Sequence, residues 1–156
     1  MRKLLFLITM CLTINANAQQ LFEGINVTGL SYNELCKKMY LKGYKLDYKI
    51  EDCSTYKKVP FESFPECQVN IWAYPSGKIS NIEVIILDNK KNNKVHSDPF
   101  YWLSNKLENQ YGKCQEEKND GYSIKKSWTN TPFDRITLSK AYGFSKTPTT
   151  IIYYPR

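Results

Sequence analysis

Apolar residues of the chain first recur at helical spacing and then alternate with polar ones. Ser31 and Glu34 stand three residues apart before an apolar stripe, which is the pattern of a capping box, and Gly43 is placed to end that helix in a left-handed conformation. Strict alternation over residues 44–51 then predicts a half-buried strand. Its apolar face would consist of Tyr44, Leu46, Tyr48 and Ile50.

Two more strands complete this first half. Residues 53–65 are polar and contain two prolines, which predicts a loop. Strands are predicted at about 66–74 and 79–87, joined by a turn at 75–78, and the second is apolar enough to lie in the centre of a sheet. Residues 89–94 are predicted to form a polar loop.

The same order of elements then begins again. Asp98 is a candidate helix N-cap, Pro99 suits the first helical position, and Gly112 is placed to end the helix. A charged connection is predicted over 113–120. Three strands follow, at about 122–129, 133–139 and 149–154.

These patterns predict one α+β domain built of two tandem α-β-β-β modules, at about residues 25–95 and 96–156. A helix with one apolar stripe and a strand with one apolar face both need a partner layer. The simplest arrangement packs the two helices on one face of an antiparallel sheet and leaves the other face open.

This order of elements resembles that of β-lactamase-inhibitor-like envelope domains, which are tandem helix–strand modules. The second half also resembles a pattern in small secreted Bacteroidota proteins of unassigned function. The residues that carry this second resemblance are Leu103, Leu107, Tyr111-Gly112-Lys113, Trp128, Ile136-Thr137-Leu138 and Ile151-Ile152-Tyr153-Tyr154. The first family implies binding to a protein through the uncovered sheet face, and no recognition motif transfers a specific binding residue.

The N-terminal segment 1–18 has the composition of a secretory signal peptide. A short positive start precedes an apolar run over 4–12, and Ala16-Asn17-Ala18 provides a small-x-small cleavage site. We expect cleavage after Ala18 and a periplasmic or secreted bacterial protein. The apolar run is too short to span a bilayer, and a lipid anchor at Cys11 is the alternative, although Met10 stands where a small residue is expected.

Removal of this leader would leave residues 19–156 as a single domain. Loss of Arg2 and Lys3 lowers the formal net charge from +7 to +5. Lysine pairs are scattered and mixed with acids, so we expect no nucleic-acid binding. No later segment is long and apolar enough to predict a membrane span.

Four cysteines lie beyond the leader, and an even number in an exported chain suggests two disulfides. Cys53 and Cys67 flank the predicted loop, so we expect them to pair, which leaves Cys36 and Cys114 for a second bond. A plain buried thiol at Cys36 is the alternative. With no C-x-x-C motif and only one histidine, we expect no zinc site, no other metal and no cofactor.

Catalytic motifs of hydrolases and phosphate-binding loops do not occur in the chain. His96, the only histidine, is expected to be a solvated loop residue. Histidine-free carboxylate chemistry stays open, and Glu83 is notable because it lies within an apolar strand, where we expect it to point to solvent. The candidate acids are Asp47, Glu51, Asp52, Glu62, Glu66, Glu83, Asp88 and Asp134.

Aromatic residues are abundant, with 12 Tyr and 3 Trp in the chain. Trp72 alternates along its strand with Ile71 and Ala73, and Tyr154 follows Tyr153. Because the helices would cover one face of the sheet, one of the two alternating sets in each strand should lie on the open face, where Tyr and Trp suit a protein or glycan partner. The alternative is that they stabilise an open sheet through cross-strand pairs. The candidate binding residues are Trp72, Tyr74, Trp128 and Tyr154, with Lys49 and Lys125 to favour an acidic partner.

The leading hypothesis is an exported, non-enzymatic protein-binding domain of inhibitor or immunity type, with a glycan as the alternative partner. Two other classes stay open. One is a small envelope enzyme that acts on glycans through two carboxylates, and the other is a structural or assembly component of the cell envelope.

Overall fold

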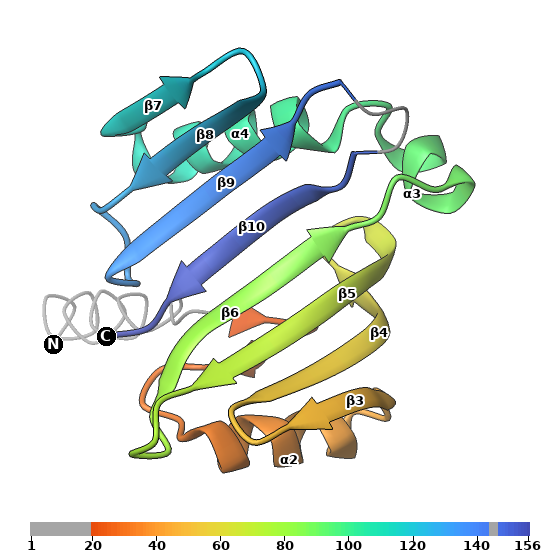
Figure 1. The fold of residues 1–156 in the computed structure, drawn as a ribbon, viewed down its shortest axis with the longest axis vertical. Helices are drawn as coiled ribbons and strands as arrows, with labels where there is room; N and C mark the ends of the chain where they lie inside the picture. The colour runs from red at the N-terminus through yellow and green to blue at the C-terminus, as the bar shows by residue number, and fades with distance from the viewer. Residues whose placement is uncertain (1–19, 144–146) are drawn as a thin grey trace, which may run out of the picture.

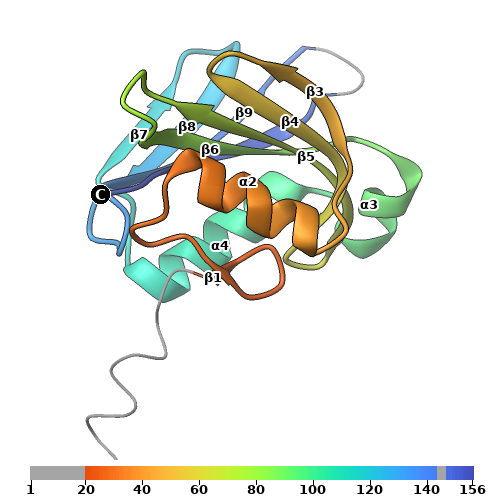
Figure 2. The same cartoon turned by 90° about the horizontal axis from the view of Figure 1, so that it is seen from below.

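The computed structural model describes residues 20–143 and 147–156, and its main element is an eight-stranded antiparallel sheet with helices on one face (Figures 1 and 2). The strands lie in the order β3-β4-β5-β6-β10-β9-β8-β7. Their bounds are β3 Leu46–Ile50, β4 Cys53–Phe61, β5 Phe64–Ala73, β6 Ile79–Ile86, β7 Glu116–Asn119, β8 Ser123–Trp128, β9 Arg135–Ala141 and β10 Thr149–Tyr154.

The two long helices begin and end where local chemistry predicts. Helix α2 (Tyr32–Leu41) has the capping box of Ser31 and Glu34, and Gly43 after it has φ +82°. Helix α4 (Pro99–Tyr111) is capped by Asp98, whose carboxylate accepts from the backbone N–H of Phe100 and Tyr101. Both lie on the same face of the sheet (Figure 2), so the predicted α+β class and helix placement are confirmed.

The predicted loop 53–65 is instead strand β4 and the start of β5. A bulge shifts the register between Tyr56 and Val59, and Lys58 within it has φ +56°. The alternation of buried and exposed residues therefore changes phase within β4, so the sequence shows no regular period that would predict this strand. Pro60 is tolerated because β3 pairs with β4 only as far as Tyr56.

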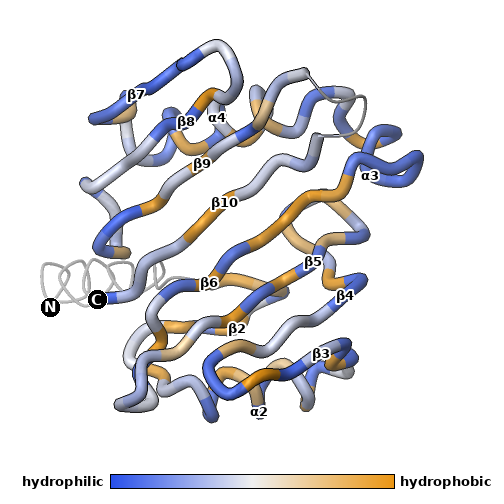
Figure 3. The backbone as a smooth tube through the Cα atoms, in the orientation of Figure 1, coloured by the Kyte–Doolittle hydropathy of each residue, from blue (hydrophilic) through white to orange (hydrophobic). Residues whose placement is uncertain are grey.

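Strand β7 was also missed, because the predicted connection 113–120 contains four residues, Glu116–Asn119, that pair with β8. All four are exposed and polar, so no apolar pattern marks them; β7 is blue along its length in Figure 3. Each long helix is thus followed by four strands, and the predicted count of three is wrong. The predicted loop 89–94 mostly forms a short helix, α3 (Lys90–Val95), which Asn89 caps.

Strand β3 is not half-buried as predicted, because it lies at the edge of the sheet and all five of its residues are exposed. A register shift between Leu46 and Tyr48 also breaks its single apolar face. Leu46 lies opposite Tyr56, whereas Tyr48 and Ile50 lie opposite Thr55 and Cys53.

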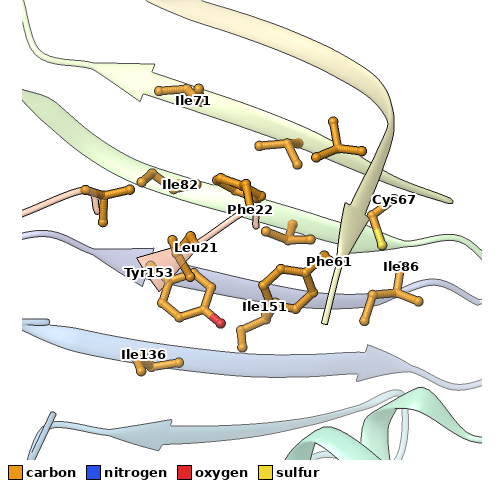
Figure 4. Packing of buried hydrophobic residues seen from close by; sticks show 14 of the residues in the cluster. Leu21, Phe22, Phe61, Cys67, Ile71, Ile82, Ile86, Ile136, Ile151 and Tyr153 are labelled. Atoms are coloured by element: carbon orange, nitrogen blue, oxygen red, sulfur yellow. The ribbon is translucent and has the colours of Figure 1, made fainter. Parts of the chain in front are cut away.

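The core lies between the sheet and the helices. Figure 4 shows Phe61 and Tyr153 side by side, with the β1 (Gln20–Leu21) and β2 (Ile25–Asn26) hairpin bringing Leu21 and Phe22 against them. The ring centroids of Phe61 and Tyr153 are 6.3 Å apart. Other fully buried side chains on this side are Leu35, Met39, Val69, Ile71, Ile82, Val84, Phe100, Ile136, Leu138 and Ile151.

All four cysteines in the described part of the chain are free, so the predicted disulfides are wrong. Cys53 lies opposite Trp72, and Cys67 is five residues away along β5. At about 3.4 Å per residue this is about 17 Å, whereas a disulfide needs Cα atoms within about 7 Å. Cys36 is a half-buried free thiol, as the alternative stated.

The predicted leader, residues 1–18, lies outside the described residues. Among the residues that are described, no helix has the length and apolar character that crossing a membrane requires.

Candidate interaction face

The open face is defined here as the side of the eight-stranded sheet opposite α2 and α4, which no described element covers (Figures 1 and 2). Ser54 fixes the orientation of β4, because its hydroxyl is 2.6 Å from that of Tyr32 in α2. Its neighbour Thr55 therefore lies on the open face. Residues directly opposite one another share a face, so the register traces a row across all eight strands. That row is Tyr48, Thr55, Asn70, Glu83, Ile152, Thr137, Ser127 and Glu116.

A hydrogen-bonded polar network occupies the open face over β4, β5 and β6. The side-chain amide of Asn70 donates to Oε2 of Glu83 over 2.7 Å, and its oxygen accepts from the hydroxyl of Thr55 over 3.0 Å. Gln68 Nε2 donates to the same oxygen over 3.2 Å. Asn70 is only 8% exposed, so neighbouring side chains hold it in one geometry. Three adjacent strands thus present a fixed polar centre.

Aromatic side chains lie toward one end of this network. Trp72 is half-buried and lies opposite Cys53, and Cys53 in turn lies opposite Ile50 on the edge strand. Tyr154 lies opposite Arg135, and the guanidinium carbon of Arg135 is 4.3 Å from the Tyr154 ring centroid. Such a pair is a cation–π contact that leaves a flat, positively charged surface.

The predicted binding residues do not all share this face. Trp72, Tyr154 and Lys125 lie on it, and Lys125 is opposite Ser139 and Lys118. Tyr74 is 57% exposed but lies beyond the end of β5, in the turn that leads to β6.

Two of the predicted binding residues belong to the helix side. Trp128 is fully buried, and its indole N–H donates to the carbonyl of Gly112 over 3.0 Å. It is therefore a core residue that ties β8 to the end of α4, and its assignment to a binding site is wrong. Lys49 lies opposite Ser54, with its Nζ 6.0 Å from the Tyr32 ring centroid, so it too faces away from the open face.

Several residues of the open face are not among the binding residues predicted from the sequence. Tyr48 and Ile50 were assigned to a buried face, and the bulge in β3 is what moves them. Asn70 could have been recognised from the sequence, because its polar amide between Val69 and Ile71 interrupts an apolar strand. Arg135 could not have been recognised in this way, since its contact with Tyr154 depends on the pairing of β9 with β10.

Three of the candidate acids form ion pairs with lysines. Glu83 lies on the open face as expected. Asp47 pairs with Lys57 over 2.8 Å, Glu62 pairs with Lys106, and Glu66 pairs with Lys91. In the part of the chain that the structure describes, no three His, Cys, Asp or Glu side chains gather to hold a metal ion.

The single histidine is not the solvated loop residue that was expected. His96 is half-buried and stacks on Trp102, with ring centroids 4.3 Å apart. Its Nε2 is 3.1 Å from the hydroxyl of Ser63 in the β4–β5 turn. It therefore joins this turn to α4 on the helix side of the sheet.

The buried thiols are poor nucleophiles. Burial raises the pKa of Cys67 to about 12, and it also raises the pKa of Cys53. A thiol with a raised pKa is protonated at neutral pH and reacts slowly.

No protein-family model matches the chain, and neither a curated protein nor a solved structure is significantly similar to it. The resemblance to inhibitor-like envelope domains therefore stays a prediction, and the open face rests on its own geometry.

Proposed function

We propose that this chain is an exported, non-enzymatic protein-binding domain of inhibitor or immunity type, and that the open face binds the partner protein. The observation that carries the proposal is the combination on this uncovered face of Trp72, the stacked pair of Tyr154 and Arg135, and a fixed polar centre. Trp, Tyr and Arg are the residues that contribute most to binding energy in protein interfaces.

The way in which this face is held also supports a binding role. Asn70 is bonded to partners on both neighbouring strands, so little side-chain entropy remains to be lost there on association. The mechanism would be occlusion, in which a pre-formed sheet covers a site on the partner. The charges of Glu83 and Arg135 would set the register of the two surfaces.

A duplicated architecture is part of the same proposal. Each long helix is followed by a four-stranded antiparallel meander, and the last strands of the two meanders, β6 and β10, pair with each other. We infer that these are two tandem modules whose sheets join at this seam. The seam crosses the middle of the open face, so both modules would contribute to one binding surface.

The acidic and sulfur groups support a binding role over a catalytic one. The candidate acids Asp47, Glu62 and Glu66 form ion pairs with lysines of neighbouring elements. Cys67 and Cys53 have raised pKa values. A carboxylate-dependent glycosidase would instead need two acids on either side of an open cleft.

The test is affinity capture with the purified exported protein from the cell envelope of its source, followed by titration calorimetry with any protein recovered. The double variant Trp72→Ala with Tyr154→Ala should lose the partner. The variant Tyr122→Ala is the matched control, because Tyr122 is 82% exposed and lies in the turn between β7 and β8.

The control variant should bind as the wild type does. Equal binding by the double variant would overturn the assignment of the open face. Turnover of a glycan by the purified protein would overturn the non-enzymatic part, and saturable binding of a glycan that the double variant loses would replace the protein partner with a carbohydrate.

A further inference from the structure

Strand β3 leaves one edge of the sheet open, and this edge is unusually apolar. Its only strand partner in the described chain is β4, so its outer edge presents unpaired backbone groups. Leu46 is 50% exposed, Tyr48 59% and Ile50 39%. The opposite edge, β7, has only polar residues, which is the usual protection against edge-to-edge pairing.

The sequence along this edge is complementary to itself when it is read in the opposite direction. In an antiparallel pair of two β3 strands centred on Tyr48, Asp47 of each chain lies opposite Lys49 of the other. Leu46 then lies opposite Ile50, and Lys45 opposite Glu51. In the sequence, every charged residue from 45 to 51 thus faces an opposite charge, and every apolar residue faces an apolar one. In the structure, the register shift places Leu46 on the helix side and Ile50 on the open side, so this outer pair does not share a face.

Other registers lose this match. A pair centred on Lys49 would place that lysine opposite itself and Asp47 opposite Glu51, and a pair centred on Asp47 would place two aspartates together and Lys45 opposite Lys49. A half-step to either side sets charged residues opposite apolar ones. Like charges directly opposite each other destabilise a sheet, so the Tyr48-centred register is strongly preferred.

We propose that a second copy of this chain docks on β3 through its own β3, with a two-fold axis at Tyr48, so that two eight-stranded sheets form one continuous sheet. The symmetry makes each contact occur twice, as an isologous interface requires. Opposite residues share a face, so the two Tyr48 rings would lie together on the open side, and Lys49, which lies opposite Ser54, would point toward the helices.

Local geometry supports the central pairs of this interface. Lys49 lies opposite Ser54, on the helix side, and its ammonium is 6.0 Å from the Tyr32 ring centroid. Among the residues that the structure describes, it has no carboxylate within ion-pair distance. The Asp47 side chain contacts Lys57 and is still 39% exposed, so one side of its carboxylate is open to a second lysine. The bulge between Leu46 and Tyr48 changes the phase of alternation, so Leu46 and the residues before it drop out of the match and the pairs formed by residues 47–49 carry the argument.

Further apolar surface lies at the same end of the molecule. Helix α2 precedes β3 in the chain, and at its C-terminal end Tyr40 is 77% exposed and Leu41 is 71% exposed. Edge pairing of two copies would bring the two α2 helices toward each other across the axis. These side chains would add buried area to a short strand pairing, which alone is small for a stable dimer.

The test is sedimentation velocity of the exported protein over a range of concentrations. The wild type should show a monomer–dimer equilibrium. Asp47→Lys and Lys49→Asp each place two like-charge pairs at the axis, so each should raise the dissociation constant at least about tenfold. The double variant, which exchanges the two charges, should restore the wild-type constant.

A mixture of the two single variants gives the sharpest result, because one then has two lysines and the other two aspartates in the central positions. The mixture should form a heterodimer although neither variant self-associates, and this outcome also shows that both are folded. Lys118→Glu on β7 is the control and should leave the equilibrium unchanged. A monomeric wild type at millimolar concentration, or dimers that both single variants retain, would overturn the proposal without affecting partner binding by the open face.

Discussion

Replacement of Trp128 by Phe tests whether this residue belongs to the core or to a binding surface. The side chain is fully buried, and its indole N–H donates to the carbonyl of Gly112. Loss of one hydrogen bond costs about 1 kcal/mol when the remaining partner can reach water, and Gly112 is exposed. The void left by the smaller ring costs about 1 kcal/mol more.

Trp128→Phe should therefore lower the free energy of unfolding by about 2 kcal/mol, which corresponds to a fall in Tm of about 6 °C for a chain of this size. Urea denaturation followed by far-UV circular dichroism measures this without relying on tryptophan fluorescence. The matched control is Trp72→Phe on the open face, which should change the stability by less than about 1 kcal/mol. Partner binding should survive the first variant and weaken in the second. A Trp128→Phe protein with wild-type stability and lost binding would refute the assignment of this residue to the core.

Three further outcomes follow from the described contacts. Asn70→Ala should lower the free energy of unfolding by about 1–3 kcal/mol in urea titrations, because it leaves the partly buried side chains of Thr55 and Glu83 without this hydrogen-bond partner. Backbone N–H groups of Tyr122 and Ser123 lower the pKa of the Asp120 carboxyl, so its stabilising contribution is present at neutral pH and is lost as the pH falls below the ordinary range of an aspartate. Stability curves of the wild type and Asp120→Asn should therefore converge at low pH. Burial raises the pKa of the Cys67 thiol to about 12, so iodoacetamide at pH 8 should leave Cys67 unmodified in the native protein. The same reagent should modify Cys67 in urea, and peptide mass spectrometry measures both outcomes.

Short-range chemistry was predictable from the sequence because the responsible groups lie within a few residues of one another. The capping box of Ser31 and Glu34 and the cap at Asp98 need only local geometry, and the structure has both. The left-handed residue at Gly43 belongs to the same class. These signals predict where the two long helices begin and end.

The missed strands share a different cause, which is that their patterns carry no regular period. In β4 the bulge at Lys58 changes the phase of alternation within the strand. In β7 every residue is polar and exposed, so pairing with β8 alone makes it a strand. Disulfide pairing failed for a related reason, since Cys53 and Cys67 were placed around a loop that is in fact an extended pair of strands.

The composition of the open face depends on register across the seam between β6 and β10, which no single segment encodes. Ile152 lies opposite Glu83, and this pairing puts Tyr154 on the same side as Trp72. A shift of one residue would exchange the faces of β10, exposing Ile151 and Tyr153 and burying their neighbours. Because Ile151 is fully buried and Tyr153 is 5% exposed in the core, that shift would remove two large side chains from it. Packing on the helix side thus determines which aromatic residues the opposite face presents, and the choice between Trp72 and Trp128 follows from the same constraint.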